Sequence, residues 1–79
     1  MTANLAAVFD VAGMERTARL RELRMAARLL LGPRHELTRA LASAIADPDA
    51  LGDALAILDA LPALPRRRLL ATLVSVLPA

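Results

Sequence analysis

Hydrophobic residues in this chain recur mostly every three or four positions, the spacing that places side chains on one face of an α-helix. The longest such stretch is the predicted helix at residues 14–31. Its predicted buried face consists of Leu20, Leu23, Ala27, Leu30 and Leu31. A second apolar set on another side consists of Met14, Ala18, Met25 and Leu29. Two apolar faces predict that this helix contacts two neighbours.

Glycine and proline mark the ends of the predicted helices. Gly13 predicts a break or kink after a short helix at residues 3–12, the alternative being one continuous helix to residue 31. Gly32-Pro33 ends the second helix and starts a third at residues 34–46. Asp47-Pro48-Asp49 predicts the start of a fourth helix. Asp is a favoured N-cap, Pro fits the first helical position, and an acidic side chain is favourable near the positive N-terminal end of a helix.

The fourth predicted helix extends to about residue 61, and a turn containing two prolines separates it from a last helix at residues 65–77. The predicted buried face of the third helix consists of Leu37, Leu41, Ala44 and Ile45. That of the fourth helix consists of Leu51, Ala54, Leu55, Leu58 and Leu61. The last helix is apolar on most of its circumference, with only Thr72 and Ser75 as a polar strip.

Composition supports the same fold class. The chain contains 18 Ala and 17 Leu, which are among the best helix formers, and Phe9 is its only aromatic residue. We therefore predict one all-α domain over residues 1–79, a small bundle of four or five helices whose last two form an antiparallel hairpin.

A chain of 79 residues buries only about 60 % of its extended surface, and without cysteine it has no disulfides to support a small core. Because a helix that is apolar nearly all round must be covered by its surroundings, we expect a second chain to cover the last helix. The predicted partner interface is Leu69, Leu70, Leu73, Val74, Val76, Leu77, Met14, Met25 and Leu29. The leading hypothesis is a non-enzymatic interaction module, such as an adaptor, assembly factor or chaperone-like subunit, acting as a homo-oligomer or within a complex.

Charge raises an alternative function. All ten basic residues are Arg, the net charge is +2, and the first 39 residues are the more basic half. The Arg-rich second helix and the helix after it predict a DNA-binding regulator in which Arg34 and Arg39, with His35 and Thr38, read a groove. The dilution of this basic region by Glu15, Glu22 and Glu36 makes it the second choice.

Arg66, Arg67 and Arg68 occupy the first turn of the last helix, where positive charge opposes the helix dipole. They are candidate contacts for an anion or an acidic partner. The alternative is that they pair with Asp59 or other acids of the same chain.

No arrangement predicts catalysis, a metal or a cofactor. His35 is the only histidine and is expected at the surface, and Ser43 and Ser75 lack a catalytic sequence context. The acids Asp47, Asp49, Asp53 and Asp59 lack the spacing of a calcium loop. The longest uncharged run, residues 69–79, is shorter than the roughly 20 residues of a membrane span, and the absence of cysteine favours the cytoplasm.

Overall fold

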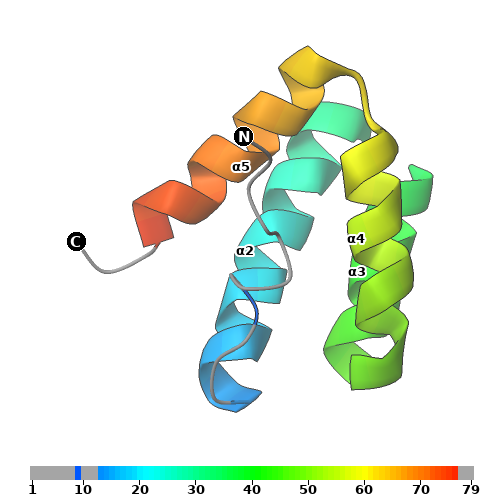
Figure 1. Cartoon of the computed structure of the whole chain (residues 1–79), viewed down its shortest axis with the longest axis vertical. Coiled ribbons are helices and arrows are strands. Elements are labelled where there is room, and N and C mark those ends of the chain that lie inside the picture. Colours follow the sequence, from blue (N-terminus) through cyan, green and yellow to red (C-terminus); the bar gives the residue numbers. More distant parts are fainter. Residues whose placement is uncertain (1–8, 10–12, 77–79) are drawn as a thin grey trace.

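The computed structural model describes Phe9 and residues 13–76, with the side chains of residues 74–76 left out. This part of the chain contains four α-helices and no strand, which confirms the predicted all-α bundle (Figure 1). The helices are α2 (Gly13–Leu31), α3 (Glu36–Ala46), α4 (Leu51–Ala60) and α5 (Ala63–Val76), and a 3-10 turn, η1 (Pro48–Ala50), precedes α4. The helix predicted at residues 3–12 lies outside the described residues except for Phe9, which is in a turn.

Neighbouring helices reverse direction from α2 to α3 and again from α3 to α4 (Figure 1). The helix α3 packs against both α2 and α4, whereas α5 returns to pack against α2 and runs away from α4. The predicted hairpin of the last two helices is therefore not confirmed, because α4 and α5 are joined by a turn but pack on different helices. This arrangement places the last helix beside the long Arg-rich helix.

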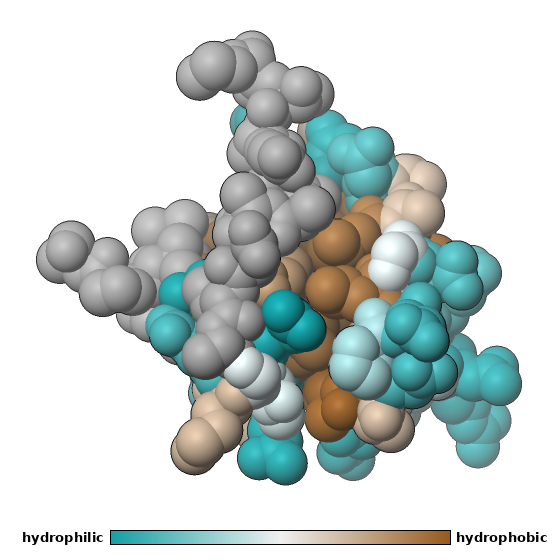
Figure 2. Space-filling model, turned by 60° about the horizontal axis from the view of Figure 1, so that its bottom comes forward, coloured by the Kyte–Doolittle hydropathy of each residue, from teal (hydrophilic) through white to brown (hydrophobic). Residues whose placement is uncertain are grey.

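One hydrophobic core joins all four helices and Phe9. Its buried members are Phe9, Leu20, Leu23, Ala27, Leu37, Leu41, Ala44, Ala54, Leu58, Leu69 and Leu73. Most of the faces predicted from spacing are confirmed, but Leu30 was assigned to the core and is 44% exposed. Other hydrophobic residues are only partly covered. Figure 2 accordingly shows apolar side chains gathered in the middle of one face, with hydrophilic residues beside them.

The connection between α2 and α3 is fixed by three local contacts. Gly32 ends α2 with φ 103°, a left-handed conformation suited to glycine, and its N–H donates to the Arg28 carbonyl at 3.1 Å. His35 is the N-cap of α3, where its Nδ1 accepts from the Leu37 N–H at 3.1 Å. Thr38 is buried and its hydroxyl donates to the Gly32 carbonyl at 2.8 Å. Because of this cap, α3 begins at Glu36 rather than at the predicted residue 34.

The predicted cap at Asp47 is confirmed. Its Oδ1 accepts from the Asp49 N–H at 3.0 Å, and Pro48 takes the first helical position. The capped segment is the short turn η1, so α4 itself begins only at Leu51.

Two arginines of α2 are used by the fold. Arg19 pairs with Glu15, which lies one helical turn earlier, and its Nη2 is 2.8 Å from Glu15 Oε1. Arg19 is also buried, which the pattern did not predict. Arg16 Nε donates to the Phe9 carbonyl at 2.8 Å, so this side chain ties α2 to the segment that carries the buried aromatic ring.

Candidate functional site

The exposed side of α2 carries the first part of the predicted interface. Met14 is 91%, Met25 61% and Leu29 79% exposed. Their spacing places them on one side of the helix, opposite the buried face that contains Leu23 and Ala27. Among the described residues, two further large hydrophobic side chains are exposed, namely Leu30 and Leu64.

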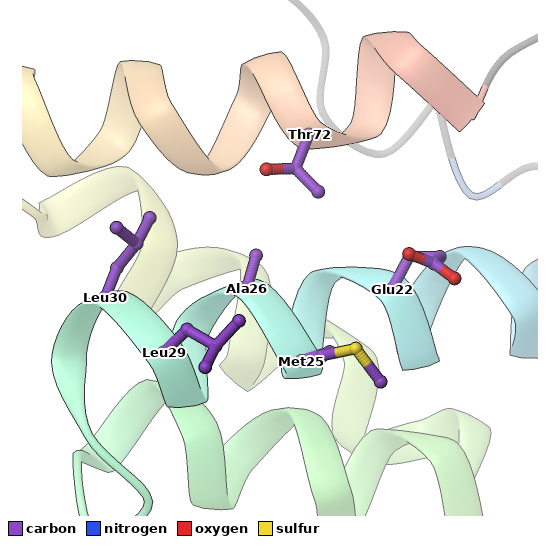
Figure 3. A pocket seen from close by; sticks show the side chains of 6 residues that line it. All are labelled: Glu22, Met25, Ala26, Leu29, Leu30 and Thr72. Carbon is purple, nitrogen blue, oxygen red and sulfur yellow. The ribbon is translucent and has the colours of Figure 1, made fainter.

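A hollow of about 310 Å³ lies between α2 and α5. In Figure 3, Thr72 points from α5 toward α2, Ala26 and Leu30 rise from α2 toward it, and Glu22 stands at one end. Met25 and Leu29 form the near wall on α2. The lining is predominantly apolar, and its polar members are Glu22 and Thr72. The Thr72 hydroxyl donates to the Arg68 carbonyl at 3.2 Å, one turn earlier in α5.

A second hollow, of about 190 Å³, adjoins the first at Leu30, which lines both. Its remaining walls are Leu31, Leu64, Pro65 and Arg68. We call the two together the α2–α5 groove. A third hollow, of about 250 Å³, shares Met25 with the groove and is otherwise lined by Arg21, Arg24 and Arg28, which we call the arginine edge. The groove thus has an apolar floor and a basic border.

The α5 part of the predicted interface needs correction. Leu69 and Leu73 are buried in the chain's own core, and Leu70 is half-buried against it, because α5 packs on α2 of the same chain. Leu69 and Leu73 therefore offer no surface to a second chain in this structure. Val74 and Val76 belong to α5, but their side chains, and Leu77 altogether, lie outside the described part of the structure.

The three arginines at the start of α5 differ in their surroundings. Arg66 Nη1 donates to the Asp59 main-chain carbonyl at 2.9 Å, close to the end of α4. A cation there suits the negative end of α4, so Arg66 serves the turn between the two helices. Arg67 and Arg68 are exposed, and only Arg68 lines the groove. The three residues therefore do not form one anion site.

The residues of the DNA-binding alternative are divided between surface and interior. Arg34 and Arg39 are exposed. His35 is committed to capping α3, and the buried Thr38 to the Gly32 carbonyl. His35 was expected to be a surface residue without a structural role. It caps α3 because it lies two residues before Leu37, within reach of the Leu37 N–H.

The candidate chemical groups that the structure describes lie at the surface. Ser43 and the acids Asp47, Asp49, Asp53 and Asp59 are exposed, whereas the side chain of Ser75 is not described. Within the described ranges, no three His, Cys, Asp or Glu residues are grouped in a way that would hold a metal ion. Over the same residues, no helix has both the length and the apolar character needed to cross a membrane.

Sequence reasoning missed part of the groove. Leu30 was assigned to the core, Leu64 to a turn, and Thr72 to a polar strip, so their proximity was not expected. The apolar Leu64 between two prolines was a usable signal. Comparison with protein-family models, curated proteins and solved structures finds no match for this chain.

Proposed function

We propose that this protein is a small non-enzymatic protein-interaction module, and that it binds an α-helix of a partner protein in the α2–α5 groove. The observation that carries the proposal is the clustering of exposed hydrophobic residues. Of the five large hydrophobic side chains that are exposed in the described part, four line this one groove: Met25, Leu29, Leu30 and Leu64.

Burial energetics support this use of the surface. Covering a Leu or Met side chain fully contributes roughly 1.5–3 kcal/mol each before the costs of association. Because the four residues are 44–79% exposed, covering them contributes about 4–7 kcal/mol in total, and burial of the ligand's own apolar residues must supply the rest of the binding free energy. An apolar groove between two helices is the receptor in helix-in-groove recognition, in which the ligand inserts residues spaced by one helical turn. Met25 adds adaptability because its side chain has several rotatable bonds.

The alternative, a DNA-binding regulator using Arg34 and Arg39, has less support. Two of its four proposed reading residues, His35 and Thr38, are held by contacts within α3 and its preceding turn. The acid Glu36 is exposed between them in the sequence and weakens a basic surface. Salt-sensitive DNA binding that disappears in Arg34→Ala with Arg39→Ala would restore this alternative.

The experiment is a selection of helical peptides from a displayed library with randomised surface positions, using the intact protein as bait. The matched baits are Met25→Gln with Leu29→Gln, which makes the groove polar, and Ala56→Gln, which changes an exposed residue of α4. Gln has good helix propensity and no charge, so neither variant should unfold the protein. We expect peptides that bind the wild type and the Ala56 variant but bind the groove variant at least about tenfold more weakly.

Light scattering after size exclusion, over a range of dilutions, separates a partner helix from a second copy. A monomer leaves the groove free for another protein. A dimer that the groove variant dissociates would make a second copy the occupant. Failure to select any peptide whose binding depends on Met25 and Leu29, in a monomeric protein, would refute the proposed function.

A further inference from the structure

The charges around the α2–α5 groove are distributed unevenly. The arginine edge, Arg21, Arg24 and Arg28, follows one side of α2 next to Met25. The smaller hollow of the groove is lined by one charged residue, Arg68. The larger hollow is lined by Glu22, which stands at one end of it. The border of the groove therefore carries four arginines and one glutamate.

The arginine edge is not neutralised within the described part of the chain. No ion pair or side-chain hydrogen bond joins Arg21, Arg24 or Arg28 to another described residue. The acidic residues of α4 lie on a helix that packs against α3 rather than against α2. Three cations on successive turns repel one another at low ionic strength, and a ligand with acidic side chains would relieve that repulsion.

We infer that the occupant of the groove is an amphipathic helix of another protein that carries a row of acidic residues beside its apolar face. This inference rests on the proposed function and specifies the partner. Arg21 and Arg28 are seven residues apart, about 10.5 Å along α2. Two turns of the bound helix cover that length. Asp or Glu residues on successive turns, on the side that faces the arginine edge, would therefore have the same spacing as the arginines. The end of the bound helix that lies next to Glu22 should be neutral or basic.

A second copy of this chain fits the groove less well. Antiparallel pairing of two α2 helices would set one arginine edge against the other. Parallel pairing would leave Arg24 and Arg28 without an acid, because Glu15 and Glu22 both precede them in the sequence. The exposed acidic side of α4, with Asp53, Ala56, Asp59 and Ala60, offers charge but no large apolar residue to insert.

The test compares two synthetic helical peptides derived from one groove-dependent peptide of the selection described above. They share the apolar residues and differ only in the flank facing the arginine edge, which carries Glu in one and Lys in the other. Binding to the intact protein is measured by fluorescence anisotropy. We expect the Glu peptide to bind at least about tenfold more tightly than the Lys peptide, and the difference to shrink as ionic strength rises.

Two protein variants are compared. The edge variant replaces all three residues of the arginine edge by Gln, and the control variant carries Arg34→Gln and Arg39→Gln, at arginines away from the groove. The edge variant should remove most of the preference for the Glu peptide, whereas the control should retain it. Equal binding of the two peptides, or an equal loss in the control, would overturn the acidic-partner inference and leave the groove function intact. Groove-dependent peptides selected with basic flanks would overturn it as well.

Discussion

Leu29 and Leu69 provide the sharpest test of the structure, because both were assigned from sequence to a partner-covered face. The structure places them differently: Leu29 of α2 is 79% exposed, and Leu69 of α5 is 0% exposed. Removing the same three side-chain carbons at each position should therefore change the stability of the fold by very different amounts. Leu69→Ala should destabilise the fold, and Leu29→Ala should leave stability nearly unchanged.

The magnitudes are well separated. A buried Leu→Ala change costs about 2–5 kcal/mol, because apolar contact is lost and a cavity remains. A domain of this length has a total stability of roughly 4–12 kcal/mol, so Leu69→Ala should remove a large part of it. For Leu29→Ala, surface substitutions stay within about 0.5 kcal/mol, and Ala is at least as good a helix former as Leu.

Urea unfolding followed by circular dichroism, with all three proteins at one concentration, measures both differences. Repeating the measurement on the wild type and Leu29→Ala over a range of concentrations detects association, since the stability of the associating protein would then rise with its concentration. A loss above about 1 kcal/mol for Leu29→Ala that is independent of concentration, or a loss below that value for Leu69→Ala, would refute the assignment of interior and surface on α2 and α5.

Three further outcomes follow from the helix ends, each measured as a change in the urea midpoint. Gly32→Ala should lower the free energy of unfolding by about 1 kcal/mol or more, because φ is 103° at this position. Gly52→Ala should raise the free energy of unfolding by about 0.4–1 kcal/mol, because the added Cβ enters open space in α4. The reverse order of stabilities would contradict the helix boundaries. His35→Ala should cost about 0.5–2 kcal/mol and His35→Asn should restore the cap, and equal effects would exclude the capping role. Arg66→Ala should lower stability by about 0.5–1.5 kcal/mol through its lost bond to the Asp59 carbonyl, whereas Arg67→Ala should have no measurable effect.

Much of the fold could be predicted from local signals. The end of α2 at Gly32 and the cap at Asp47 follow from the conformations that Gly, Asp and Pro prefer, and those preferences act over a few residues. The buried residues Leu37, Leu41 and Leu58 follow from spacing alone, since each belongs to the one apolar face of its helix. The start of α3 was misplaced because His35 is an uncommon N-cap.

The groove could not be predicted in the same way. Spacing shows which residues of a helix share a face, but it does not show which helix covers that face. On α5, which is apolar nearly all round, the burial of Leu69 and Leu73 depends on packing against α2, about forty residues earlier in the chain. Leu30 is exposed for the same reason, because the approach of α5 leaves a hollow beside it.

The attachment of α5 has a consequence for the order in which this protein folds. The pairs α2–α3 and α3–α4 join helices that are adjacent in sequence, so they require little loop closure, whereas α5 must find α2 across the two intervening helices. Docking of α5 buries Leu69 and Leu73 and in the same step creates the groove. A ligand in the groove can therefore bind only to chains in which this long-range contact is complete, and its binding energy adds to the stability of α5. Amide hydrogens of α5 should then gain the most protection from exchange when the groove is filled.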